Sequence, residues 1–338
     1  MKRMRAVAMV GALSLLLSGC PDDPAPPAGW TEAFDASSLG WLLNVWGPTG
    51  DDLYAVGGNP MGSDGGVVMH YDGHAWSRVD LGLTVPQFNW CFGFGHDDIT
   101  IVGNEGAIIH WDGTRWERRT TPTTQRLWGV WGAAPDDMWS VGGNAFNPGD
   151  ATLLHWNGTD WSSVTPPTLT RTNVYAFFKV WGTSASNVYA VAQRGAMIHF
   201  DGTAWSEVDI GLTTSQDLIS LWGTGPNHIV AVGGRGNGVV VAWDGTAWRN
   251  RSLSPLPGLN GVWMRNDRVA HIVGIEGTIA TLDFATLDYT EVDTGTRTAY
   301  HSIFGDSTGH ITAVGGNLLA GAPPYIGLAS TRPLAADE

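Results

Sequence analysis

Residues 179–208 read KVWGTSASNVYAVAQRGAMIHFDGTAWSEV and contain four short apolar segments separated by turns. The first segment ends with Trp181 and Gly182, and the others cover residues 187–191, 196–200 and 205–208. The connecting residues include Gly, Ser, Asp and Thr, which favour turns. Four strands of about five residues each, joined by such turns, predict an up-and-down antiparallel sheet.

The same unit recurs along the chain from residue 41 onward. Each first segment ends in an apolar residue, an aromatic residue and usually a glycine; the aromatic residues are Trp46, Phe92, Trp131, Trp181, Trp222, Trp263 and Phe304. Nine residues after each glycine position the second segment ends, at Val56, Val102, Val141, Val191, Val232, Val273 and Val314. The period is 39 to 50 residues. A four-stranded repeat of this length predicts a β-propeller, and seven copies predict seven blades.

A second motif, Asp/Asn-Gly-x-x-Trp, closes the first five units, at Trp76, Trp116, Trp161, Trp205 and Trp248. The sixth unit has a degenerate copy that ends at Tyr289, and the seventh unit has none. The missing segment is present at the other end of the chain, where residues 29–32 (GWTE) match residues 204–207 (AWSE). We therefore predict that a strand around Trp30 completes the seventh blade and closes the ring, which removes open sheet edges.

Together these motifs resemble the VWG…AVG…HWDGxxW repeat of secreted bacterial proteins that are interpreted as β-propellers. The resemblance covers residues 29–330 and implies an all-β fold of seven four-stranded antiparallel blades, but it implies no activity. The closing turn also resembles in part the Asp-box of sialidase-like propellers. Here, however, glycine follows the acid directly, as in Asp112 and Gly113. Residues 331–338 would form a short C-terminal tail.

Residues 1–19 have the pattern of a signal peptide, with a basic start and an apolar stretch too short to span a bilayer. The LSGC sequence that ends at Cys20 is similar to the lipobox of bacterial lipoproteins. This resemblance implies cleavage before Cys20, acylation of its thiol and attachment to a membrane through lipid. Because Pro21 rather than Asp follows, the resemblance favours the outer membrane. The proline-rich residues 20–28 would form a short tether.

The chain is acidic, with 18 Lys and Arg against 32 Asp and Glu and a formal net charge of −14. Removal of the leader takes away three basic residues and no acidic residue, which leaves about −17. Such a surface repels nucleic acid and anionic lipid headgroups, so we exclude both as partners. With Cys20 acylated, Cys91 has no disulfide partner. It replaces a Val, Leu or Ile of the other units, which predicts a core residue.

Several polar and aromatic residues recur in equivalent positions, and we interpret them as structural. The acid pairs at 51–52, 97–98 and 136–137 are replaced in other units by Ser, Asn, Gly or His, which suits turn capping better than calcium binding. One histidine per unit, at His70, His110, His155 and His199, places these side chains on different blades, too far apart for one metal ion. Most of the 18 tryptophans also occupy repeat positions, which predicts a packing role.

Residues outside the repeat consensus are the candidates for ligand binding. The loops that enter each first strand and those between second and third strands should share one face. The latter are long at residues 57–66, 142–151 and 315–324. Aromatic residues and arginine near the strand entries are typical of recognition surfaces. The candidates are Phe88, Trp90, Arg126, Trp128, Arg171, Tyr175, Gln216 and Tyr300.

The sequence contains no nucleophile motif, cofactor loop or localised metal-ligand cluster. We therefore expect no catalytic residue, no metal and no cofactor. The prediction is a monomeric, lipid-anchored module of the cell envelope that binds a protein or carbohydrate without catalysis. Two alternatives remain open. A propeller glycosidase or lyase would need ionisable residues that converge on the central channel, and an envelope-assembly factor would resemble the outer-membrane-assembly propeller lipoproteins.

Overall fold

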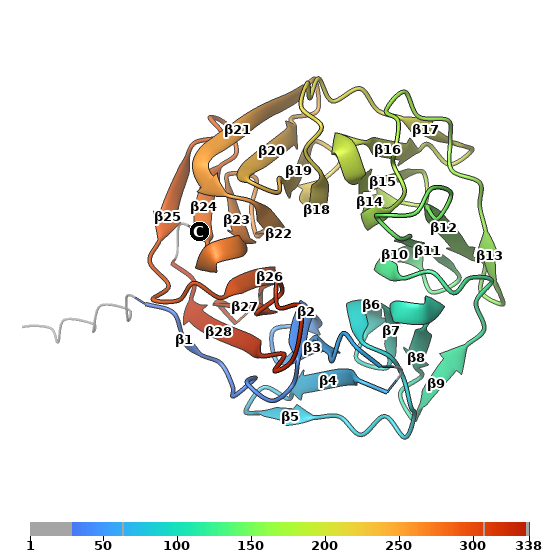
Figure 1. The fold of residues 1–338 in the computed structure, drawn as a ribbon, viewed down its shortest axis with the longest axis vertical. Coiled ribbons are helices and arrows are strands. Elements are labelled where there is room, and N and C mark those ends of the chain that lie inside the picture. Colours follow the sequence, from blue (N-terminus) through green and yellow to red (C-terminus); the bar gives the residue numbers. More distant parts are fainter. Residues whose placement is uncertain (1–28, 63, 307, 336–337) are drawn as a thin grey trace, which may run out of the picture.

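The computed structural model describes residues 29–62, 64–306, 308–335 and 338. Seven four-stranded antiparallel sheets are arranged as blades around a central axis (Figure 1). The predicted all-β, seven-bladed propeller is confirmed. The leader, Cys20 and the proline-rich tether lie outside the described residues. Within the described ranges, no helix has the length and hydrophobicity needed to cross a membrane.

Each blade begins at the inner edge of the ring and ends at the outer edge. The strands are β2 (Trp41–Thr49), β3 (Asp52–Gly58), β4 (Gly66–Tyr71) and β5 (Trp76–Arg78) in blade 1; β6 (Phe88–Gly95), β7 (Asp98–Gly103), β8 (Ile108–Trp111) and β9 (Trp116–Arg119) in blade 2; β10 (Leu127–Ala134), β11 (Asp137–Gly142), β12 (Thr152–Trp156) and β13 (Trp161–Ser163) in blade 3; β14 (Phe177–Ser184), β15 (Asn187–Ala192), β16 (Met197–Phe200) and β17 (Trp205–Glu207) in blade 4; β18 (Leu218–Gly225), β19 (His228–Gly233), β20 (Asn237–Trp243) and β21 (Trp248–Pro257) in blade 5; β22 (Leu259–Met264), β23 (Val269–Gly274), β24 (Ile279–Asp283) and β25 (Tyr289–Val292) in blade 6; and β26 (Ala299–Gly305), β27 (His310–Gly316), β28 (Gly327–Pro333) and β1 (Thr31–Glu32) in blade 7. Short 3-10 turns η1 (Asn104–Gly106), η2 (Gln193–Gly195) and η3 (Ile275–Gly277) follow the second strands of blades 2, 4 and 6.

Blade 7 is built from both ends of the chain. Strand β1 pairs antiparallel with β28, and Thr31 lies opposite Thr331. Next to this strand, Trp30 packs against the apolar core of blades 6 and 7, and the guanidinium carbon of Arg332 lies 5.5 Å from its ring centroid. The predicted closure of the ring by an N-terminal strand is confirmed.

The aromatic–glycine pair near the end of each inner strand has a reason in the packing between blades. A Cβ atom on Gly223 would lie 2.6 Å from the ring of Trp181, which belongs to the preceding blade. The same close approach recurs between Trp131 and Gly182 and between Trp263 and Gly305. Each of these glycines therefore leaves room for the tryptophan ring of the neighbouring blade. A residue with a Cβ atom would not fit there, because real Cβ atoms do not approach another atom so closely.

Blade 6 departs from this pattern because Met264 stands where a glycine would accept Trp222. The indole N–H of Trp222 donates to the Met264 carbonyl at 3.2 Å. Its ring centroid lies 6.1 Å from that of Phe304, which belongs to blade 7 rather than blade 6. Aromatic side chains at the same position of blades 1 and 2 also meet, since the ring centroids of Trp46 and Phe92 are 5.6 Å apart. These residues form an aromatic collar at one end of the inner strands.

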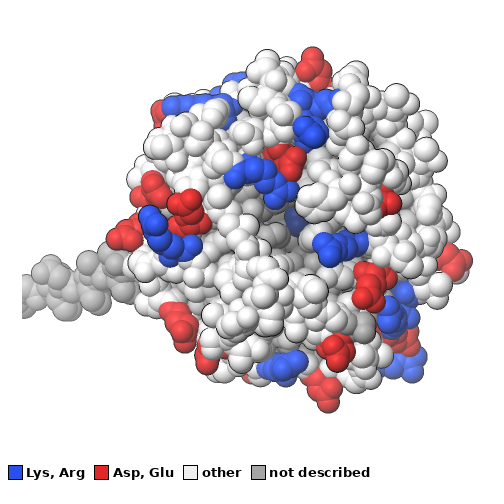
Figure 2. All heavy atoms as spheres, viewed as in Figure 1, with Lys and Arg blue, Asp and Glu red and all other residues white. Residues whose placement is uncertain are grey.

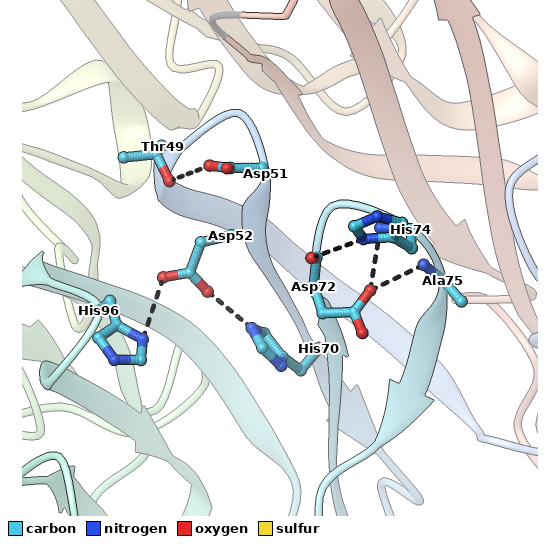
Figure 3. Close-up of polar contacts among 8 residues, drawn as sticks. All are labelled: Thr49, Asp51, Asp52, His70, Asp72, His74, Ala75 and His96. Carbon is cyan, nitrogen blue, oxygen red and sulfur yellow. Dashed lines mark hydrogen bonds and ion pairs between the residues drawn. The ribbon is translucent and has the colours of Figure 1, made fainter.

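Figure 3 shows how the recurring Asp-Gly turn is built in blade 1. The Asp72 carboxylate accepts the backbone N–H groups of His74 and Ala75, each at 2.9 Å. Gly73 has a φ of +87°, and a Cβ atom there would lie 3.0 Å from Cβ of Asp51. A left-handed backbone and this close approach both favour glycine, which explains why it follows the acid directly.

The second acid of each pair hydrogen-bonds to the recurring histidine of its own blade. Asp52 Oδ1 lies 2.6 Å from His70 Nε2, and Asp52 Oδ2 lies 3.8 Å from His96 Nδ1 (Figure 3). The pair recurs in blades 2 and 3, as His110 with Asp98 and His155 with Asp137. The acids therefore join the second and third strands in addition to lying at turns. Among the described residues, no group of three or more His, Cys, Asp or Glu side chains could hold a metal ion.

Candidate binding surface

One face of the ring carries both the turns between second and third strands and the connections that lead into the inner strands. We call it the loop face. Backbone hydrogen bonds join the two sets: the Gly143 N–H donates to the Arg126 carbonyl at 2.9 Å, and the Gly234 N–H donates to the Asp217 carbonyl at 2.8 Å. The short 3-10 turns of this face lie toward the viewer in Figure 1. The prediction that both loop sets share a face is therefore correct.

Three turns of the loop face are long, at residues 59–65 in blade 1, 143–151 in blade 3 and 317–326 in blade 7. In the described part of the chain, every strongly exposed large hydrophobic side chain belongs to one of these turns. These side chains, which we call the loop tips, are Met61 (67 % exposed), Phe146 (88 %), Leu319 (86 %) and Ile326 (40 %). Single exposed apolar residues are common on protein surfaces, but here all four lie on one face, which makes this face the candidate for contact with a partner.

A Gly-Gly-Asn motif precedes all three long turns and no other turn of the loop face, so this signal could have singled them out from the sequence. The Asn side-chain oxygen accepts a backbone N–H of its own loop: Asn59 from Met61 at 2.9 Å, Asn144 from Phe146 at 3.1 Å and Asn317 from Ile326 at 2.8 Å. In blade 3 the second glycine, Gly143, has a φ of +128°, and a Cβ atom there would lie 2.4 Å from the Tyr175 carbonyl oxygen. The motif thus holds each loop in a defined shape.

Three predicted site residues, Trp90, Arg126 and Trp128, lie near the mouth of the channel on the loop face. Trp128 is half-buried and donates its indole N–H to a backbone carbonyl of the blade 3 loop at 3.0 Å. Arg126 is exposed, and its guanidinium carbon lies 6.0 Å from the Trp128 ring centroid. Trp90 is half-buried, and the Lys179 ammonium lies 3.2 Å from its ring centroid. The mouth therefore combines aromatic surface with positive charge.

Three further predicted residues, Arg171, Tyr175 and Gln216, hold loops of this face together. The Arg171 guanidinium donates to the backbone carbonyls of Arg194 at 2.7 Å, Thr214 at 3.0 Å and Leu212. The Tyr175 hydroxyl donates to Asn173 Oδ1 at 2.6 Å. Gln216 Oε1 accepts the Arg235 backbone N–H at 3.0 Å. Each of these side chains hydrogen-bonds within the protein and thereby shapes the surface.

The prediction is corrected for Phe88 and Tyr300, which belong to the core. Phe88 is fully buried between blades 1 and 2, and Tyr300 is 1 % exposed with its hydroxyl 2.9 Å from Ser330 Oγ. Each occupies the inner-strand position that other blades fill with Leu42, Leu127, Phe177, Leu218 or Leu259. Their aromatic type suggested a surface role, but the equivalent positions show a packing role.

An apolar arc lines the channel wall near the loop face in blades 3, 4 and 5, and the equivalent position is polar in the other blades except blade 1, which carries Leu43. Equivalent positions of blades 3, 4 and 5 carry Trp128, Phe178 and Ile219, which pack together. In blades 2, 6 and 7 the same position carries Asn89, Asn260 and His301, each hydrogen-bonded to a backbone carbonyl of the following blade. Sequence reasoning missed this division, although alignment of the seven inner strands shows it.

Basic side chains gather at this mouth although the chain as a whole is acidic. The Arg235 guanidinium carbon lies 5.6 Å from the Phe178 ring centroid, and its Nε lies 2.8 Å from Asp217 Oδ2. Arg126 and Lys179 have no carboxylate partner among the described residues. Figure 2 shows Lys and Arg atoms beside and within the hollow at the centre of the viewed face. Arg126 and Lys179 therefore leave positive charge at the mouth that no described carboxylate pairs with.

A separate cleft of about 640 Å³ lies at the junction of blades 3 and 4. Trp139, Phe200 and Trp205 line it, together with the Asp137–His155 pair. Because these residues occupy repeat positions, the cleft follows from the packing of the blades and lacks the unique residues of the channel mouth.

Comparison with known proteins supports the fold. No known family model matches the chain. It is 29 % identical over 114 residues to the immune protein Tsi7 of Pseudomonas aeruginosa, and the match spans 28 % of this chain and 37 % of Tsi7. The chain thus spans well under half the length of that relative.

Solved propellers match over nearly the whole chain. YCF48 bound to a D1 peptide has a TM-score of 0.63 at 16 % identity and covers 92 % of this chain and 100 % of that chain. YCF48 from Cyanidioschyzon merolae gives 0.63 at 13 % identity, over 91 % and 99 %. The WD40 propeller of Doa1 gives 0.67 at 9 % identity, over 90 % and 97 %. At these identities the similarity shows the propeller fold alone.

Proposed function

We propose that this propeller is a non-catalytic binding protein that captures a partner protein on its loop face. The confinement of the exposed apolar loop tips to that face is the observation that carries the proposal. The tips, on blades 1, 3 and 7, share the loop face with a basic, aromatic-lined mouth, so a partner could bury apolar area on the loops while polar groups at the centre select it.

A protein partner fits this surface better than a carbohydrate. The loop tips are Met, Phe, Leu and Ile, and only one of these types offers the aromatic ring on which a sugar stacks. One of the similar propellers supports this choice of class, because YCF48 is described with a bound D1 peptide.

We also propose that lipid on Cys20 holds the propeller at the outer membrane, with the loop face directed away from the attachment point. The LSGC sequence supports the lipid, and the strand directions support the orientation. β28 begins at the long turn of the loop face and runs away from it, and Thr31 of β1 pairs with Thr331 near its far end. The chain therefore enters the propeller on the side opposite the loop face, which leaves the loop tips free for a partner.

The experiment is crosslinking pull-down from intact envelopes with loop-tip variants. Phe146→Ser combined with Leu319→Ser removes two exposed tips that contribute little to the core, so melting should stay unchanged while the captured partner is lost. Ala75→Ser is the matched control, because this exposed residue lies in a turn of the opposite face. Equal capture by the double variant and the control would contradict the proposal. Turnover of a glycan that one carboxylate substitution abolishes would support an enzyme instead.

A further inference from the structure

Lys179 reaches from blade 4 into the channel and contacts two other blades. Its ammonium donates to the Trp128 carbonyl of blade 3 at 3.1 Å and lies 3.2 Å from the ring centroid of Trp90 in blade 2. Its backbone passes beside Gly129 of blade 3, where a Cβ atom would lie 3.1 Å from Lys179 Cα. A larger residue at Gly129 would block this path. The amine is therefore placed at the centre of the fold by three neighbouring inner strands.

The groups around the Lys179 ammonium neither use all of its hydrogen-bond donors nor balance its charge. Lys179 is 3 % exposed, and an ammonium group has three N–H donors, of which one meets a carbonyl and another can face the Trp90 ring. No described carboxylate forms an ion pair with it. Burial lowers the pKa of Lys179 well below its usual range. A buried cation that lacks a counter-charge is unfavourable.

The other titratable groups near the amine are neutral or carry positive charge. Burial lowers the pKa of His301 to about 3, and the positive charges of Lys179 and Arg235 lower it further against the effect of its hydrogen bond to the Leu43 carbonyl. Burial raises the pKa of the Cys91 thiol, which keeps it protonated. The Asp217 carboxylate at this mouth pairs with Arg235, so the Lys179 amine keeps an open donor and has no carboxylate partner among the described residues.

We infer that the channel mouth binds a carboxylate group of the partner, which pairs with the Lys179 ammonium. The inference rests on the proposed binding function of the loop face and names the group that would enter the channel. A carboxylate carries one negative charge, which matches the single charge of the amine. A phosphate dianion would leave an excess charge in this buried place, because no second free cation contacts Lys179 among the described residues.

The residues around the channel mouth also match the chemistry of a partner residue that carries such a carboxylate. The apolar arc of Trp128, Phe178 and Ile219 can contact an aliphatic neighbour, while Arg126, which has no described carboxylate partner, attracts the negative charge toward the mouth. Two sources share this chemistry, namely the C-terminal carboxylate of a chain and the side chain of Asp or Glu.

Lysine-selective isotope labelling tests the inference directly. The full sequence contains only two lysines, and the other one, Lys2, lies in the leader, so the mature protein should give a single lysine side-chain NMR signal. The probes are acetyl-Leu-Ala-Leu with a free C-terminus, the same peptide as a C-terminal amide, and an amide peptide that ends in Asp. A shift with the free acid identifies a terminal carboxylate, and a shift with the Asp peptide identifies a side-chain carboxylate. Either result should come with a raised pKa of Lys179, because a bound anion favours the charged amine.

Variants separate a binding role from a packing role. Lys179→Met removes the amine and keeps an unbranched side chain, so it should weaken binding of the active peptide by about tenfold to a hundredfold. Lys179→Arg keeps a positive charge and should retain binding. Ser220→Ala is the control, because Ser220 is buried at the equivalent position of blade 5 and carries no charge.

Two results would overturn the inference: a Lys179 signal that neither carboxylate peptide moves, or equal peptide affinity in Lys179→Met and the unsubstituted protein. If Lys179→Met does not fold, the NMR titration of the unsubstituted protein decides the question alone. Loss of partner capture in the loop-tip variants but not in Lys179→Met would leave the proposed function standing without a carboxylate site.

Discussion

At the scale of single residues, Gly223 on β18 shows how one missing side chain permits contact between two blades. We predict that Gly223→Ala lowers the free energy of unfolding by about 1–3 kcal/mol or more, because its Cβ would collide with the Trp181 ring and with the His228 carbonyl oxygen. Gly225→Ala on the same strand meets nothing within 4 Å and should change stability by less than about 0.5 kcal/mol. Urea denaturation of both variants checks this. Equal stabilities would show that the blades can separate enough to admit a methyl group.

His301 should make stability depend on pH. Its pKa is about 3 in the folded protein, whereas an unfolded histidine titrates near pH 6.5. Between these values the unfolded chain binds a proton that the folded protein does not, so stability should fall as the pH falls from about 6.5 toward 3. The slope from this residue is at most about 1.4 kcal/mol per pH unit. His301→Asn keeps a donor for the Leu43 carbonyl and should flatten the dependence, as measured by urea denaturation at several pH values. An unchanged slope would assign the effect to another buried histidine, such as His271, whose pKa is also lowered by burial.

At the scale of elements, β1 is short but completes a blade. Deletion of residues 29–34 removes the partner of β28 and the side chain of Trp30, whose loss alone should cost about 3 kcal/mol. Deletion of residues 21–27 takes away none of the described structure and should leave thermal melting unchanged. Equal melting temperatures for the two deletions would contradict a structural role for the N-terminal strand.

The long loop of blade 3 should be replaceable without loss of the fold. Gly142 pairs with Thr152 across this loop, and Gly233 pairs with Val239 across the short turn of blade 5. Replacing residues 143–151 by GRGNG, the sequence of residues 234–238, keeps the glycine whose N–H bonds to the preceding connection. We expect a small change in melting and a loss of partner capture, because Phe146 is removed. Retained capture would show that the partner does not use this loop.

At the scale of the whole molecule, location should depend on one residue, Cys20, which precedes the propeller in the sequence. We predict that Cys20→Ala leaves the protein with its leader uncleaved or releases it from the membrane fraction, because no thiol remains for acylation. Fractionation of cells followed by mass spectrometry of the N-terminus measures both outcomes. The loop face should still bind its partner after solubilisation. Normal acylated, outer-membrane behaviour of Cys20→Ala would exclude the lipobox.

The candidate surface was only partly predictable. Trp90, Arg126 and Trp128 lie at the channel mouth, and their departure from the repeat consensus was enough to select them. Phe88 and Tyr300 also depart from it in residue type, yet they are buried. The loop tips and Lys179 were missed. The Gly-Gly-Asn motif marks the three long turns in the sequence, but the exposure of Phe146 and Leu319 and the burial of Lys179 depend on the tertiary structure.

The sequence by itself determined the number of blades, the order of their strands and the closure of the ring. These features follow from alternating segments and turn residues that act over a few neighbours and are repeated seven times, so each copy supports the others. Only the tertiary structure decided which side chains are available to a ligand. Burial of Tyr300 depends on Ser330, and the place of Lys179 depends on Trp90, Trp128 and the missing side chain of Gly129. Such contacts join residues of different strands and blades, and their effect on exposure and charge exists only once the ring has closed.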